Sequence, residues 1–217
     1  MRNFLTILLI IFCSISFSQN ENSSRRIPAD LKVVTNHTTT ILEKKVNYSA
    51  EIGTQPIWDV KGDVIATLHY TFYKRTDINN TSNRPLIISF NGGPGAASIW
   101  MHMGYTGPYN LIVDDEGHPI QPYGYKSNPY SILDVADIVF VNPINIGYSR
   151  ILKEMSKKEA TDKFFGVNQD VEYLAEWIST FVTRNERWKS PKCYWSLDPR
   201  LLSLWFEIFL KGSSRNV

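Results

Sequence analysis

A short apolar run that ends in a glycine loop constrains this sequence most. Residues 85–90 read PLIISF, and Asn91-Gly-Gly-Pro-Gly95 follows directly. A continuous apolar run of this length is typical of a strand buried on both faces, as in parallel sheets covered by helices. Adjacent glycines at the strand end let the backbone approach a ligand closely. We therefore expect an α/β protein with a site at this loop.

Further strands are predicted on both sides of this run. Residues 45–57 are apolar at intervals and are expected to be extended. Residues 64–73 (VIATLHYTFY) are rich in β-branched and aromatic residues. They are predicted to pair back as a hairpin across the turn at residues 59–63. Residues 136–141 (ADIVFV) form a second buried-type run.

Residues 166–184 give the clearest helical signal. Their apolar residues recur at a period of 3.6, which places them on one face of a helix. Pro191 is expected to stop this region. The order of strand, glycine loop, strand and helix indicates a doubly wound sheet. The apolar face consists of Val167, Val171, Leu174, Ala175, Ile178, Phe181 and Val182.

Residues 1–19 have the pattern of a secretory signal peptide. Arg2 gives a positive start, an apolar segment follows, and small or polar residues precede Gln19. Export (secreted or periplasmic) is therefore predicted, with the mature chain starting near residue 19 or 20. The alternative is an uncleaved N-terminal anchor; no other membrane association is expected. Residues 20–31 are polar and are predicted to be a flexible lead-in.

Cysteine usage and charge restrict the possible partners. Removal of Cys13 with the signal leaves Cys193 as the single cysteine, so no intrachain disulfide is expected. A metal site built on a CxxC pair is excluded, and no metal or cofactor is predicted. The net charge of +2 gives no electrostatic reason to expect nucleic acid binding.

The glycine loop allows three interpretations. Two backbone N–H groups at a strand end can hold a developing oxyanion in acyl transfer. A tight structural turn is the simpler alternative. The third is dinucleotide binding, with Gly93 and Gly95 in the glycine loop and Asp114 as the ribose acid. Against the third, Ser98 stands at the last glycine position and Pro94 stiffens the loop.

Three motifs in order resemble those of the serine carboxypeptidase family. They are the loop Asn91-Gly-Gly-Pro-Gly95, the strand and turn at residues 134–149 that end in Gly147-Tyr-Ser149, and the helix start at residues 165–174. The resemblance extends over residues 27–192. It implies an α/β-hydrolase fold, here incomplete: the front part of a doubly wound sheet, with residues 32–192 as the family portion.

The resemblance also assigns roles within the loop. Gly93 is implied as the oxyanion-hole donor. Asn91, with Gly92 and Gly93, is implied to bind the terminal carboxylate of a peptide. There are three departures from the family pattern. Ala96 replaces the usual cysteine, residues 101–106 contain no acidic side chain, and the turn after Asn142 lacks its first glycine.

The catalytic triad has no counterpart in this sequence. No G-x-S-x-G elbow occurs, and no histidine follows His118. In the family, a strand after residues 190–192 enters the elbow. Here the resemblance stops at Lys192, and residues 193–217 form a tail outside the family pattern. We hypothesise a frameshift or gene truncation; a genuinely divergent C-terminus is the alternative, and translation of the parent DNA in all frames distinguishes them.

Three serines are substitute candidates for the nucleophile, namely Ser98, Ser149 and Ser196. None has a predictable base beside it, and a dyad of Ser98 with His102 is not expected. The sequence thus predicts a serine-type carboxypeptidase by resemblance that is inactive. The alternative is a non-catalytic module that binds peptide or protein C-termini. We also expect low stability, with an exposed sheet edge and a poorly covered face on the helix at residues 166–184.

Overall fold

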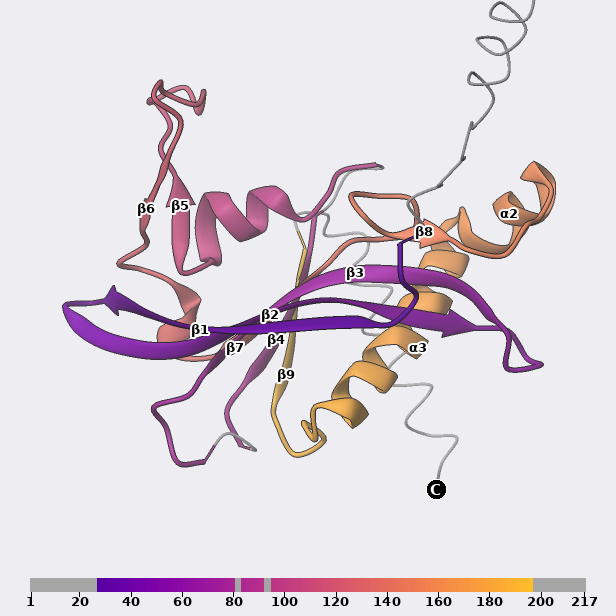
Figure 1. Cartoon of the computed structure of the whole chain (residues 1–217), viewed down its shortest axis with the longest axis horizontal. Coiled ribbons are helices and arrows are strands. Elements are labelled where there is room, and N and C mark those ends of the chain that lie inside the picture. The colour runs from indigo at the N-terminus through magenta and orange to yellow at the C-terminus, as the bar shows by residue number, and fades with distance from the viewer. Residues whose placement is uncertain (1–26, 81–82, 92–94, 197–217) are drawn as a thin grey trace, which may run out of the picture.

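The computed structural model describes residues 27–80, 83–91 and 95–196. Their main feature is a seven-stranded mixed sheet with the order β1-β2-β3-β7-β4-β9, in which β8 also pairs with β3 (Figure 1). The strands are β1 (Leu31–Ile41), β2 (Lys44–Trp58), β3 (Val64–Arg75), β4 (Leu86–Phe90), β7 (Asp137–Val141), β8 (Arg150–Ile151) and β9 (Lys192–Ser196).

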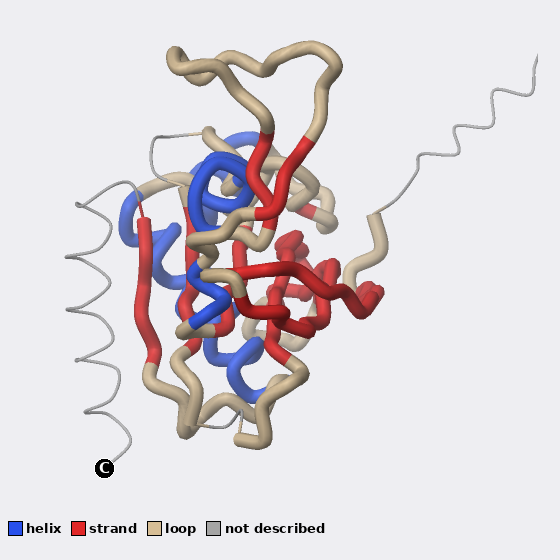
Figure 2. The backbone as a smooth tube through the Cα atoms, turned by 90° about the vertical axis from the view of Figure 1, so that its left-hand side faces the viewer, coloured by secondary structure: helices blue, strands red, loops and turns tan. Residues whose placement is uncertain are grey.

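In the described part of the chain, two α-helices and several short elements surround this sheet. The strands β5 (Tyr109–Leu111) and β6 (Tyr125–Ser127) form a separate hairpin that projects from the body of the molecule (Figure 2). No helix in the described part of the chain is both long and apolar enough to cross a membrane. The helical elements are the π-helix η1 (Trp100–Thr106), the 3-10 helix η2 (Ile132–Asp134), α2 (Lys157–Phe164) and α3 (Val167–Arg184).

The predicted hairpin is confirmed as β2 and β3. These strands pair antiparallel from Tyr48↔Arg75 to Trp58↔Val64. Asp59 closes the connecting turn, because its Oδ1 accepts hydrogen bonds from the backbone N–H groups of Lys61 and Asp63, each at 3.0 Å. A carboxylate that accepts from backbone groups further along is a common way to stabilise a turn.

Strand β1 was not predicted. It pairs along its whole length with β2 at the outer side of the sheet. Of its eleven residues only Thr39 and Ile41 are buried. An edge strand exposed on both faces lacks the apolar alternation by which a half-buried strand is recognised.

The end of the predicted lead-in is held to the sheet. The hydroxyl of Thr54 donates to the carbonyl of Pro28 at 2.7 Å, and that of Thr67 donates to the carbonyl of Ala29 at 2.6 Å. Leu31, the last residue of that segment, begins β1. Within the described residues from 27 onwards, the lead-in is thus anchored by its backbone carbonyls, which composition does not reveal. Residues 1–26, including the predicted signal peptide, lie outside the described residues.

The centre of the sheet is parallel, as the two apolar runs predict. All five residues of β4 and all five of β7 are buried, and the two strands pair parallel. On its other side β4 pairs parallel with β9, from Leu86↔Lys192 to Phe90↔Ser196. The sheet therefore continues for four residues past Lys192, where the family pattern ends. The rest of the tail, residues 197–217, lies outside the described residues.

The helix α3 confirms the prediction for residues 166–184 and covers one face of the sheet. The expectation that its apolar face would be poorly covered is wrong. Trp177 is fully buried, stacks on Phe181 and meets Tyr70 of β3 edge-on. The side chain of Gln55 on β2 also donates to the carbonyl of Trp177 at 2.8 Å. Strands β2 and β3 provide a large part of this cover, and Tyr194, two residues past Lys192, packs against the same core cluster.

The opposite face of the sheet is covered by η1 and η2. Met101 of η1 is buried with Ile87 of β4 and with Ile138 and Phe140 of β7. Elements thus pack on both faces, as expected for a doubly wound sheet. On the side of β9 away from β4, no further strand follows among the described residues.

Candidate functional site

The glycine loop lies where two parallel strands end. Asn91 follows β4 and Asn142 follows β7, and the strands are adjacent and parallel. In open α/β sheets the carboxyl ends of such strands form the crevice in which ligands bind. Gly92 and Gly93 lie outside the described residues, so their roles as backbone donors remain predictions.

Asn91 is buried with an unsatisfied acceptor. Only 6% of the residue is exposed. Its backbone N–H donates to Ser98 Oγ at 3.2 Å. Its side-chain Oδ1 has no hydrogen-bond partner among the described residues. A buried polar atom without a partner costs about 1–3 kcal/mol. A ligand that donates a hydrogen bond here would remove that cost.

Ser98, which follows the glycine loop, is hydrogen-bonded to the end of β7. Its hydroxyl donates to the carbonyl of Val141 at 2.6 Å, and its backbone N–H donates to Asn142 Oδ1 at 2.9 Å. The residue is 3% exposed. The hydroxyl proton is therefore committed to a backbone carbonyl inside the protein. Ser98 has a structural role here and is not placed as a nucleophile.

Asn142 extends this network to a histidine. Its Nδ2 lies 3.2 Å from His69 Nδ1. An amide nitrogen only donates, so His69 Nδ1 accepts and carries no proton in this arrangement. Burial lowers the pKa of His69, which favours the same neutral form.

Ser149 closes the network on the backbone side. Its hydroxyl donates to the carbonyl of Asn142 at 2.7 Å and accepts from the backbone N–H of His69 at 2.9 Å. The residue is fully buried. Like the Ser98 hydroxyl, the Ser149 hydroxyl is therefore engaged in hydrogen bonds to backbone groups. The third serine considered as a nucleophile, Ser196, ends β9, and its side chain lies outside the described residues.

The structure explains why the turn motif has a glycine at position 147. Its φ is +54°, a conformation that L side chains rarely adopt. A Cβ added at this position would lie 2.6 Å from Asn142 Nδ2. The close approach keeps the Asn142 amide in place against His69. The turn functions as a support for Asn142 although the first glycine of the family pattern is missing.

His102 lies in a separate environment. Its Nε2 is 2.6 Å from the Tyr73 hydroxyl oxygen, and its ring stacks on Phe140 with centroids 4.6 Å apart. Burial, with a smaller effect of the His69 charge, lowers the pKa of His102 to about 4. The imidazole is neutral at pH 7, but its Nε2 is bound to Tyr73. The expectation that Ser98 and His102 form no dyad agrees with these contacts, because the Ser98 hydroxyl donates to Val141 instead.

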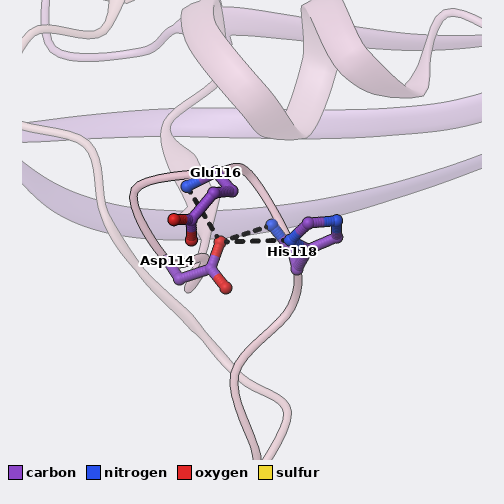
Figure 3. A group of neighbouring side chains, drawn as sticks. All are labelled: Asp114, Glu116 and His118. Carbon is purple, nitrogen blue, oxygen red and sulfur yellow. Dashed lines mark hydrogen bonds and ion pairs between the residues drawn. The ribbon is translucent and has the colours of Figure 1, made fainter.

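Asp114 is part of a turn and not of a dinucleotide site. Figure 3 shows that Asp114, Glu116 and His118 lie close together. Asp114 Oδ1 accepts from the backbone N–H groups of Glu116 at 3.1 Å and His118 at 2.7 Å. This turn lies between β5 and β6, whereas a ribose-binding acid follows the second strand of a βαβ unit. All three side chains are exposed, and their arrangement is that of a turn stabilised by an aspartate.

The comparison with known proteins was made on sequence and on structure. The family model described as "Serine carboxypeptidase" matches residues 54–188. Carboxypeptidase Y of Schizosaccharomyces pombe is 27% identical over 136 residues, which cover 61% of this chain and 12% of that protein. Carboxypeptidase Y homolog A of Leptosphaeria maculans is 31% identical over 97 residues, which cover 44% of this chain and 16% of that protein.

A solved structure shares the fold. It is that of Kex1(delta)p, a prohormone-processing carboxypeptidase from Saccharomyces cerevisiae, with a TM-score of 0.56 and 17% sequence identity. The match covers 76% of this chain and 35% of that one. The described sheet therefore corresponds to part of an α/β-hydrolase fold, and this chain spans a minor part of each of these relatives. Because the family model covers more than half of the sequence, the chain belongs to the serine carboxypeptidase family.

Proposed function

We propose that this chain is a serine-type carboxypeptidase by descent that hydrolyses no peptide bond by itself. This proposal is supported by the hydrogen bonds that Ser98 and Ser149 make near the loop. The hydroxyls of Ser98 and Ser149 both donate to backbone carbonyls. A nucleophilic serine instead needs its hydroxyl proton directed at a base, with the base oriented by a third group.

The histidines of the described region support the same conclusion. His69 Nδ1 accepts from Asn142, and His102 Nε2 is bound to Tyr73. In the described part of the chain these two ring nitrogens are thus bound to Asn142 and Tyr73, and not to a serine hydroxyl. The sequence contains no G-x-S-x-G elbow and no histidine after His118 to supply another pair.

A fluorophosphonate probe tests the absence of a nucleophile. We expect no covalent labelling of the purified chain, measured by intact mass, and no release of C-terminal residues from peptides. Labelling of any serine would overturn the proposal, and peptide mapping would then identify that serine. An active serine carboxypeptidase treated in parallel serves as the positive control.

The second candidate function is capture of peptide C-termini without hydrolysis. The buried Asn91 with its unpartnered Oδ1 favours it, because the side chain lies at the ligand-binding edge of the sheet. An amide can donate to a terminal carboxylate through Nδ2 while Oδ1 accepts from the last peptide N–H. In this proposal the backbone N–H groups of Gly92 and Gly93 add donors for the carboxylate.

Calorimetry with a peptide and its C-terminal amide distinguishes a chain that binds peptide C-termini from one that has the family fold but binds no peptide. Binding of the free acid, weaker binding of the amide and loss of binding in Asn91→Ala would support the binding module. Asn110→Ala, on strand β5 of the separate hairpin, serves as a control because Asn110 Oδ1 is likewise buried without a hydrogen-bond partner among the described residues. No binding of either peptide would leave the chain with neither function.

Export is proposed on the sequence of residues 1–19. N-terminal sequencing of the protein from its native host tests it. We expect the mature chain to begin near residue 19 or 20. A chain that retains Met1 and stays in the cytoplasm would exclude export.

A further inference from the structure

A cavity of about 710 Å³ lies apart from the loop at Asn91. It is bordered by the turn between β2 and β3, by residues 153–155, and by α2 and the first half of α3. Figure 1 shows α2 close to the start of α3, and these elements form one wall. Its volume is in the range of small-molecule sites. It shares no lining residue with the network of Asn91, Ser98 and Asn142.

The inner lining of the cavity is apolar. Ile57 and Ile65 come from the two strands beside the turn, Phe164 ends α2, and Tyr173 lies on α3. All four are buried, with 1–5% exposed. Met155 also lines the cavity and packs against the same core. The apolar part of a ligand that bound against these side chains would be shielded from water, which favours binding.

The rim of the cavity is acidic. Lys153 also lines it, but its Nζ is 2.9 Å from Asp59 Oδ2 and 3.4 Å from Asp63 Oδ2, so its charge is already matched. Lys163 is the other lysine among the lining residues, and its charge acts on Glu176. The carboxylates that line the cavity in addition to Asp59 are Glu154, Glu159, Asp162, Glu172 and Glu176.

Two of these carboxylates repel each other. Glu172 and Glu176 are four residues apart on α3, which places them on the same side of the helix. Burial raises the pKa of Glu176 and the charge of Glu172 adds to that effect, whereas the hydrogen bond from Trp58 and the charge of Lys163 act in the opposite direction. The Glu176 carboxylate also accepts from the backbone N–H of Trp58 at 3.4 Å, which keeps it at the cavity wall. A cation between the two glutamates would relieve their repulsion.

We propose that this cavity binds a small organic ammonium ligand, with its apolar body against Ile57, Ile65 and Phe164 and its charged group at Glu172 and Glu176. The apolar lining and the excess of carboxylates select for both parts of such a molecule. Anions and zwitterions with a central carboxylate are disfavoured by the same rim. The proposal is independent of peptide capture at Asn91, since no residue is shared.

The test uses the full chain and three probes. 4-Phenylbutylammonium carries both features, 4-phenylbutanol is its neutral counterpart, and acetyl-Phe-Lys-amide offers a lysine side chain without a free C-terminus. Binding is followed by calorimetry and by NMR shifts. We expect the ammonium probe to bind and the alcohol to bind at least about tenfold more weakly. Binding of the blocked peptide as well would assign the site to lysine side chains of peptides; its failure would assign it to free amines.

Matched variants locate the charge. Glu172→Gln with Glu176→Gln keeps the size of both side chains and the acceptor for Trp58, and should weaken the ammonium probe about tenfold. Glu116→Gln, at an exposed turn outside the cavity, should leave binding unchanged. Equal affinity for the alcohol, equal loss in the control variant, or no binding at millimolar probe would overturn the proposal. A chain without a cooperative thermal transition would lack the cavity and would overturn it too.

Discussion

Arg187 Nη1 donates to Asp137 Oδ2 at 2.6 Å inside the protein. The Asp137 carboxylate is fully buried, and its other oxygen accepts from Arg84 Nε at 3.0 Å. Arg187 also donates to the carbonyl of Arg84 and to the hydroxyl of Ser190. This group of charges joins the start of β7 to the segments before β4 and after α3. A buried acid shared by two guanidiniums makes the three segments depend on one another.

Replacement of that acid should strongly destabilise the fold. Asp137→Asn leaves two arginines without their shared charge partner, and breaking a buried pair costs about 3–5 kcal/mol. The free energy of unfolding from urea titration measures the loss. Asp134→Asn is the control: its carboxylate is 3.7 Å from Arg75 and more exposed. We expect its cost to be below about 1 kcal/mol. Equal losses in the two variants would contradict the role assigned to Asp137.

Gly147 should tolerate alanine less well than another glycine of similar backbone geometry. Gly147→Ala combines a positive φ with a Cβ 2.6 Å from Asn142 Nδ2. Gly117 has a φ of +88° but no atom within 4 Å of an added Cβ. Gly117→Ala should therefore cost only the backbone strain, about 1–2 kcal/mol, and Gly147→Ala clearly more. The melting temperatures of the two variants provide the measurement; the reverse order would exclude the close packing of Asn142.

The buried His102 should make stability depend on pH. Its pKa falls from 6.5 to about 4 on folding, so the unfolded chain binds the proton first as the pH decreases. The contribution of neutral His102 to the free energy of unfolding is fully present above pH 6.5 and is lost as the pH falls towards 4. The loss is roughly 3 kcal/mol over this window.

Comparison with a histidine variant isolates that contribution. His102→Gln keeps a partner for Tyr73 but does not titrate, and should flatten the stability curve between pH 7 and 4 relative to wild type. Exposed His118→Gln should leave the curve unchanged. Urea unfolding at several pH values measures both. Parallel curves for wild type and His102→Gln would show that the imidazole does not control this range.

Trp177 of α3 and Trp188, which follows α3, should differ sharply in what their replacement costs. Trp177→Ala removes a fully buried ring that contacts Tyr70 and Phe181 and should cost about 3–5 kcal/mol. Trp188, with 57% of the residue exposed, serves as the control. Trp188→Ala should change stability by about 0.5 kcal/mol or less. If Trp177→Ala were equally mild, α3 would not be docked on β2 and β3 in solution.

The elements that could be predicted from sequence are those with a strong local pattern. The helix α3 has one apolar face, and β4 and β7 are continuous apolar runs, so their type follows from periodicity. Strand β1 escaped prediction because Thr35 to Thr40 carry no alternation on an exposed edge. The π-helix η1 escaped prediction because Gly104 interrupts a short segment whose burial depends on β4 and β7.

The candidate site was predicted only in part. Asn91 follows from the motif, and the missing glycine of the turn after Asn142 was visible as a departure. The contact of Asn142 with His69 depends on the antiparallel pairing of β3 with β7, in which Tyr70 faces Val141. Such a pairing joins residues far apart in sequence, and no local pattern of a single chain reveals it. The same holds for the cavity between α2, α3 and the turn after β2.

The order of strands also has a consequence for the timing of folding. The meander of β1, β2 and β3 joins neighbouring segments, and the pairings of β1 with β2 and of β2 with β3 need no residue after Arg75. Among the described residues β4 pairs with β7 and β9, both of which come later in the chain. Contacts over long sequence separations slow folding, and an unpaired apolar strand is prone to association in the meantime. During synthesis β4 therefore lacks its sheet partners until Asp137–Val141 have been made, and in that interval LIISF is available to a holding chaperone that binds short apolar segments.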